Sequence, residues 1–66
     1  MDIFLNGEPR QVATDQTLAS LIEQLGYTGK RIATERNGEI VPKSQYTDTL
    51  LAAGDRLEIV VAVGGG

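Results

Sequence analysis

Two Asn-Gly pairs, Asn6-Gly7 and Asn37-Gly38, place the strongest constraint on how this 66-residue chain folds. Asn and Gly both tolerate the positive φ that a two-residue type I′ turn requires. Residues that alternate between apolar and polar flank each pair, and this alternation is typical of strands. The sequence therefore predicts two tight hairpins, one at the start of the chain and one beyond its middle.

Four strand segments flank these two turns. The expected strands cover residues 1–5, 10–14, 31–37 and 39–41. Pro9 lies at the start of the second strand, where its missing N–H does least harm to the sheet. Pro42 ends the fourth strand, because proline cannot donate a hydrogen bond to a continuing ladder.

Between the two hairpins the apolar period changes from two to 3.6. The residues that follow the spacing of one helical face are Leu18, Leu21, Ile22 and Leu25. Thr17 is the expected N-cap, with Asp15 as the alternative. Gly26 suits the position after the helix, where a left-handed conformation closes the last turn. A further short helical turn is expected near residues 44–46.

Residues 56–63 are the most apolar segment and are expected to form the last strand. Its inward face comprises Leu57, Ile59, Val61 and Val63. An exposed edge of this composition would invite aggregation, so we expect the strand inside the sheet, beside the first one. The order ββαβββ then predicts an α+β fold of the β-grasp (ubiquitin-like) type, in which a mixed four- to five-stranded sheet packs on one helix.

The composition excludes several classes of chemistry. The chain has no Cys and no His, so it lacks thiolate nucleophiles, imidazole bases and Cys/His zinc sites. Its nine acidic residues are spread from Asp2 to Glu58, as on a solvated surface. A net charge of −3 argues against nucleic acid. With no long apolar run and no signal stretch, we expect a cytoplasmic protein with no bound cofactor, metal or membrane.

The segment VAVGGG places three glycines directly after the last strand. We expect a domain of residues 1–63 followed by a flexible glycine tail, residues 64–66. Three extended residues reach roughly 10 Å, and without Cβ atoms they can enter a slot that admits only backbone. The terminal carboxylate is ionised at neutral pH and can attack the α-phosphorus of ATP. The alternative is a frayed end without a function.

Five segments of the chain resemble the ubiquitin-like sulfur carriers of thiamine biosynthesis, the ThiS family. They read IFLNGE, TLASLIEQLG, ERNGEIVPKSQY, AGDRLEIV and VGGG. The resemblance implies that the terminal Gly66 is adenylated by an E1-like enzyme, ThiF, which uses ATP and magnesium. It implies that the adenylate becomes a thiocarboxylate. We expect Gly64 and Gly65, as the rest of the narrow tail, to be needed for this activation; relatives can have alanine in place of Gly64.

The resemblance also implies the partners of the reaction. The sulfur would come from cysteine through a desulfurase or a related relay. The thiocarboxylate would donate it to thiazole synthase, ThiG, so this chain would be a protein co-substrate and not an enzyme.

Two other functions remain open on the sequence. The small subunit of molybdopterin synthase has the same fold and terminal thiocarboxylate but a different acceptor. It tends to be longer and lacks the stretch ERNGEIVP, so it ranks second. The other is a ubiquitin-like protein modifier or interaction module, whose Gly-Gly is joined to lysines or is only a tail.

Three apolar residues are candidates for a partner-docking surface. Phe4, Val60 and Ala62 are out of step with the inward residues of their strands. If the first and last strands are neighbours, these three side chains share the sheet face opposite the helix. Exposed apolar clusters often mark a partner surface, although single exposed apolar residues are common on any protein.

Overall fold

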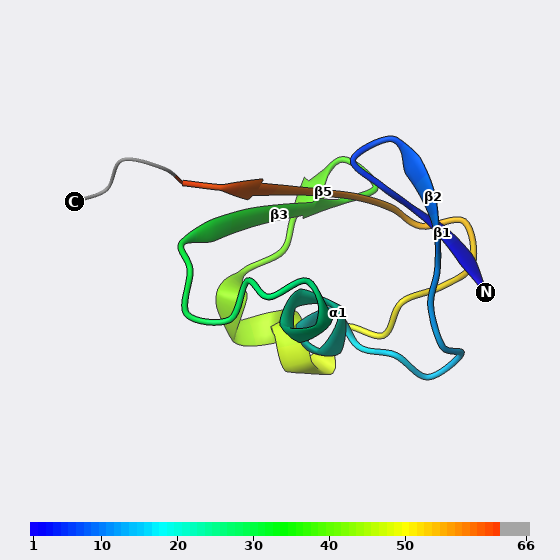
Figure 1. The fold of residues 1–66 in the computed structure, drawn as a ribbon, viewed down its shortest axis with the longest axis horizontal. Coiled ribbons are helices and arrows are strands. Elements are labelled where there is room, and N and C mark those ends of the chain that lie inside the picture. Colours follow the sequence, from blue (N-terminus) through cyan, green and yellow to red (C-terminus); the bar gives the residue numbers. More distant parts are fainter. Residues whose placement is uncertain (63–66) are drawn as a thin grey trace.

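A computed structural model describes residues 1–62, which form a mixed five-stranded sheet with an α-helix and a 3₁₀ helix packed against it (Figure 1). The elements in chain order are β1 (Asp2–Leu5), β2 (Glu8–Gln11), α1 (Leu18–Gln24), β3 (Ile32–Arg36), β4 (Glu39–Ile40), η1 (Lys43–Asp48) and β5 (Arg56–Val61). The predicted β-grasp fold is confirmed. Val63, the glycines Gly64–Gly66 and the expected boundary between them lie outside the described residues.

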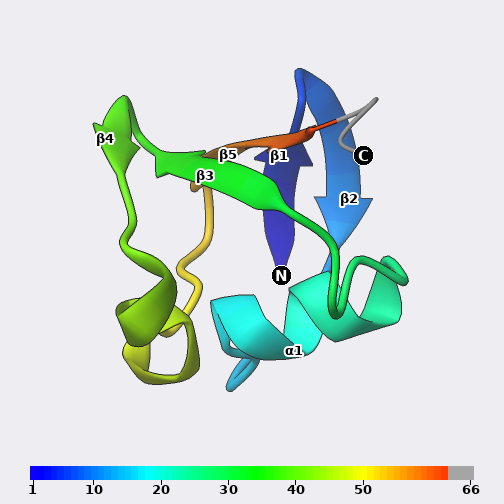
Figure 2. The same ribbon diagram turned by 90° about the vertical axis from the view of Figure 1, so that its left-hand side faces the viewer.

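The strand β5 lies at the centre of the sheet. The strand order is β2-β1-β5-β3-β4, with β5 parallel to β1 and antiparallel to β3. Figure 2 shows α1 and η1 on the same side of this sheet. The prediction that the most apolar strand lies inside the sheet and beside the first strand is therefore correct.

Both Asn-Gly pairs form the predicted hairpin turns. The φ angles are 51° at Asn6 and 85° at Gly7, and 53° at Asn37 and 86° at Gly38. Positive φ at both central residues is the requirement of a type I′ turn. These turns place Leu5 opposite Glu8 in the first hairpin, and they start the returning strand at once.

The expected extent of the second strand, residues 10–14, is wrong. β2 runs from Glu8 to Gln11 and includes Pro9, which lies opposite Phe4. The N–H of Phe4 points the other way and donates to the Asp55 carbonyl oxygen at 2.8 Å. Pro9 therefore occupies a position of an edge strand where no N–H is needed, which is where proline is tolerated.

The helix α1 begins and ends as its sequence predicts. The Thr17 hydroxyl accepts a hydrogen bond from Ser20 N at 3.1 Å, so Thr17 is the N-cap. Gly26, with φ of 78°, and the following Tyr27 donate their N–H groups back to the last helical turn, at 3.0 and 3.1 Å. This pair of bonds is a Schellman closure. The helical turn expected at residues 44–46 is longer than predicted and spans Lys43–Asp48.

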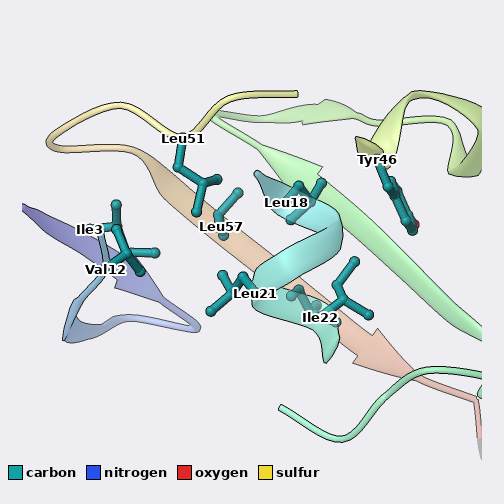
Figure 3. Packing of buried hydrophobic residues seen from close by; sticks show 9 residues of the cluster. Ile3, Val12, Leu18, Leu21, Ile22, Tyr46, Leu51 and Leu57 are labelled. Carbon is teal, nitrogen blue, oxygen red and sulfur yellow. The ribbon is translucent and has the colours of Figure 1, made fainter. Parts of the chain in front are cut away.

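The core lies between the sheet and the two helices (Figure 3). Its buried residues are Ile3, Val12, Leu18, Leu21, Ile22, Tyr46, Leu51, Leu57 and Ile59. Val61, predicted to face inward with Leu57 and Ile59, is only half-buried. The reason is that β1 pairs with β5 only as far as Leu57, so one side of β5 is not covered by a strand at Val61.

Candidate functional site

The strand β5 precedes the predicted reactive glycines in the sequence. Leu57 and Ile59 are 1% and 4% exposed, so the first part of the strand is held in the core. The chain then leaves β5 at Ala62 and continues into residues 63–66. Since Gly64, Gly65 and Gly66 lie outside the described residues, the site is built from the strand that leads to them.

A buried carboxylate, Asp55, fixes the start of β5. Its Oδ2 accepts hydrogen bonds from Arg36 Nε at 2.9 Å and from Ala52 N at 2.8 Å. Its Oδ1 accepts from Asn37 Nδ2 at 3.1 Å. The Asn37 side chain in turn accepts from Arg56 N at 2.9 Å. One carboxylate therefore joins the first residue of β5 to the end of β3 and to the turn after it.

The surroundings of Asp55 lower its pKa. Burial raises the pKa of this carboxyl group, because it disfavours the charged form. The hydrogen bonds from Ala52 N, Asn37 and Arg36, together with the charge of Arg36, lower the pKa by more than burial raises it. The pKa of Asp55 therefore lies below its ordinary value of 3.8, and the carboxylate is fully ionised at neutral pH.

The three predicted docking residues share the sheet face opposite α1, which we call the outer face. Phe4 is 40% exposed, Val60 is 65% exposed, and Ala62 is also exposed. The register places Phe4 beside Arg56, so the Glu58 position separates Phe4 from Val60 along β5. The structure thus brings Val60 and Ala62 together near the end of β5 and leaves Phe4 at the other end.

The outer face has a further apolar residue that the sequence reasoning missed. Ile40 of β4 is 67% exposed and lies opposite Glu35 of β3, which lies opposite Glu58 of β5. The signal was present in the sequence, because a two-residue turn at Asn37-Gly38 pairs residues 35 and 40. Any residue opposite an outward-facing Glu35 must also face outward.

Two like charges lie in the middle of the outer face. Glu35 and Glu58 are directly opposite each other on neighbouring strands. Like charges in this arrangement destabilise a sheet. Phe4, Arg56 and Glu58 also line a shallow open hollow at this place. The outer face therefore has apolar side chains toward both ends of β5, with the two opposed carboxylates and the basic Arg56 between them.

Neither metal ligands nor a membrane segment are found in residues 1–62. No group of three or more His, Cys, Asp or Glu side chains in this part of the chain could hold a metal ion. No helix among the same residues is long and apolar enough to cross a membrane.

Comparisons with known proteins agree on one family. The family model described as "ThiS family" matches residues 3–66. The sulfur carrier protein ThiS of Escherichia coli is 32% identical over 66 residues, which are 100% of both proteins. The crystal structure of the thiamine biosynthesis protein (ThiS) from Geobacter metallireducens superposes with a TM-score of 0.83 at 28% identity and covers 100% of both chains.

A longer relative has a different name. The thiazole synthase of Paramagnetospirillum magneticum is 44% identical over 66 residues, which are 100% of this chain and 20% of that protein. The chain thus spans about a fifth of the length of this relative.

The Asp55 cluster predicts how stability depends on pH. Because the pKa of Asp55 is lowered on folding, its contribution is complete above 3.8 and is lost as the pH falls through the folded-state pKa. We expect Asp55→Asn to lower the free energy of unfolding at neutral pH by about 1–3 kcal/mol. The difference from the unmodified protein should shrink well below pH 3.8. Urea unfolding at neutral pH and at a pH well below 3.8 measures this difference in the free energy of unfolding.

The exposed Asp48 provides the matched control for this experiment. Asp48→Asn should change the free energy of unfolding by about 0.5 kcal/mol or less at either pH. An equal loss for Asp55→Asn at both pH values would contradict the ionised role of Asp55.

Proposed function

This chain belongs to the ThiS family, the sulfur carriers of thiamine biosynthesis, and we propose that the carboxyl group of Gly66 is the group that carries the sulfur. The observation that supports this most is the position of β5. A central strand, which pairs with β1 and β3 and buries Leu57 and Ile59, precedes the glycine segment. Such a strand presents the last residues to another protein while the domain stays folded.

The proposed chemistry begins with activation of the terminal carboxylate. Its oxygen attacks the α-phosphorus of ATP in an E1-like, ThiF-like enzyme, and pyrophosphate leaves with its magnesium ion. The product is an acyl-adenylate at Gly66. A sulfur nucleophile, supplied from cysteine through a desulfurase or a related relay, then attacks the acyl carbon. If the donor sulfur is a persulfide, AMP leaves and an acyl disulfide forms, and a second thiol then reduces the S–S bond, which leaves a thiocarboxylate on Gly66 and a disulfide on the donor.

The acceptor of the sulfur is proposed to be a ThiG-like thiazole synthase. The thiocarboxylate sulfur attacks the acceptor as a nucleophile; the bond between the Gly66 acyl carbon and the sulfur then breaks, an oxygen atom from water or from the acceptor takes the place of the sulfur, and the carrier returns with an ordinary carboxylate. The relative named thiazole synthase supports this partner, because a segment similar to the whole of this chain forms a fifth of that protein. In this scheme the chain is a co-substrate of two enzymes and binds no cofactor itself.

We propose that the outer face docks on these partners. Val60 and Ala62 lie next to the glycine segment, and Phe4 and Ile40 lie farther along the same face. The opposed carboxylates of Glu35 and Glu58 favour a partner surface that places a basic side chain between them, since this would relieve their repulsion.

The first prediction concerns the terminal carboxylate. Deleting Gly66, or adding one residue after it, moves the carboxyl group by about 3.5 Å along an extended tail. We expect either change to abolish ATP–pyrophosphate exchange by the activating enzyme, while circular dichroism and urea unfolding stay unchanged. Normal exchange with the extended protein would rule out Gly66 as the group that is activated.

The second prediction concerns the width of the tail. Gly65→Val places a branched side chain where only backbone is expected to fit, and it restricts φ. We expect activation or sulfur transfer to fail in a reconstituted thiazole synthesis. Gly65→Ala is the graded control and should lose less activity. Full activity of the valine variant would contradict a slot that admits only backbone.

The third prediction concerns the outer face. Val60→Asp adds a charge at a 65% exposed position, so it should cost about 1 kcal/mol or less of folding free energy. We expect it to weaken binding to both the activating enzyme and the thiazole synthase, as measured by titration of each partner. Leu57→Asp, at a 1% exposed position, should unfold the domain instead. Unchanged affinity of folded Val60→Asp for both partners would place docking elsewhere.

A further inference from the structure

The two edges of β5 are paired over different lengths. Hydrogen bonds to β3 involve the even-numbered residues of the strand and continue to its end, where Ala62 N donates to Arg31 O at 2.9 Å. Hydrogen bonds on the opposite edge involve the odd-numbered residues. There the carbonyl oxygens of Asp55 and Leu57 accept from Phe4 N and Asn6 N, each at 2.8 Å. After Asn6 the chain of β1 turns away from β5 and enters β2.

At the next position of this second edge, Ile59, a side chain takes the place of a neighbouring strand. The Asn6 Oδ1 accepts from Ile59 N at 2.9 Å, and the Asn6 Nδ2 donates to Ile59 O at 3.3 Å. The amide of Asn6 thus occupies both backbone groups of Ile59, as a neighbouring strand would. Asn6 can do this because it sits in the turn, with φ of 51°, and its side chain reaches back to β5.

Val61 is the first residue of β5 that lacks such a partner. The alternation along the strand directs its N–H and C=O toward the same edge as those of Ile59. No group of residues 1–62 makes a hydrogen bond to either of them. Figure 1 shows the reason: β5 and β3 continue together away from β1 and β2. Within residues 1–62, Val61 is therefore the one position of β5 whose edge opposite β3 is open.

We propose that this open edge of β5 at Val61 pairs with an extended segment of the thiazole synthase. An extended segment that adds to a sheet satisfies N–H and C=O groups such as those of Val61 and requires no particular side chains. An apolar edge left unpaired is an aggregation hazard, which a partner strand removes. The half-buried Val61 and the exposed Val60 fit that description.

The choice of partner rests on the proposed function and on the longer relative. In the Paramagnetospirillum thiazole synthase, a segment similar to this chain is part of the same protein. Pairing at Val61 would also set the register of the residues that follow it. A strand held residue by residue up to the glycines would place the Gly66 carboxyl carbon at one fixed distance from the partner, which transfer of a single sulfur atom requires.

The test uses two substitutions at Val61. Val61→Pro removes the N–H from the open edge, and it spares the β3 ladder because Val61 and Ile32 form a non-hydrogen-bonded pair. Val61→Ala is the matched control, since it shortens the side chain and keeps the N–H. We expect Val61→Pro to weaken binding of the full-length carrier to the thiazole synthase about tenfold, and Val61→Ala to weaken it much less.

Amide hydrogen exchange tests the same edge without a substitution, in case Val61→Pro folds poorly. In the free ¹⁵N-labelled carrier, the Val61 amide should exchange faster than the Ile59 amide, which Asn6 holds. Addition of the thiazole synthase should slow exchange at Val61 at least about tenfold. Unchanged exchange at Val61 in the complex, or full binding by folded Val61→Pro, would overturn the proposal.

Two further outcomes separate this proposal from others. Protection of Val61 that rises with carrier concentration in the absence of the synthase would assign the edge to a second copy of the chain and overturn the assignment to the synthase. A carrier whose Val61 is protected by the synthase, but whose Gly66 is never adenylated, would refute the proposed function and support the edge.

Discussion

The parallel pairing of β1 with β5 is the interaction on which the rest of the structure depends. Parallel neighbours need a long connection, and here the chain between β1 and β5 contains β2, α1, the second hairpin and η1. This connection supplies the residues that cover the inner face of the sheet. The pairing also places the last strand at the centre. The Asn6 side chain extends this pairing to Ile59, and the Asp55 carboxylate ties the start of β5 to Arg36 of β3 on the other edge.

Much of this architecture follows from local sequence signals. The two Asn-Gly turns, the helix with its Thr17 cap and Gly26 closure, and the central position of β5 were all predictable, because each depends on a short pattern or on the burial of one apolar strand. The extent of β2 was not, since Pro9 is tolerated only where the fold leaves it an edge position. Pro9 fits opposite Phe4 because the N–H of Phe4 bonds to Asp55 and not to β2, and this arrangement depends on the order of the strands in the assembled sheet.

The candidate site was predictable in the same uneven way. The outward direction of Phe4, Val60 and Ala62 follows from alternation, and Ile40 could have been found by counting across the second turn. The pairing of the Asn6 side chain with Ile59 could not be predicted from local patterns, because it joins residues that are 53 positions apart. The open edge at Val61 follows from the different lengths of the strands beside β5, which no single segment of the sequence specifies.

In the proposed function, one strand serves three separate tasks: the outer face of β5 docks on partners, its open edge sets the register, and the glycines after it carry the chemistry. The last task is the central claim, and the intact mass of the protein isolated from its own cells tests it most directly. We expect a fraction of the protein to have a mass that corresponds to one oxygen replaced by sulfur, with fragmentation placing the change at Gly66. A protein that carries only an ordinary carboxylate at Gly66, isolated from cells that are making thiazole, would contradict it.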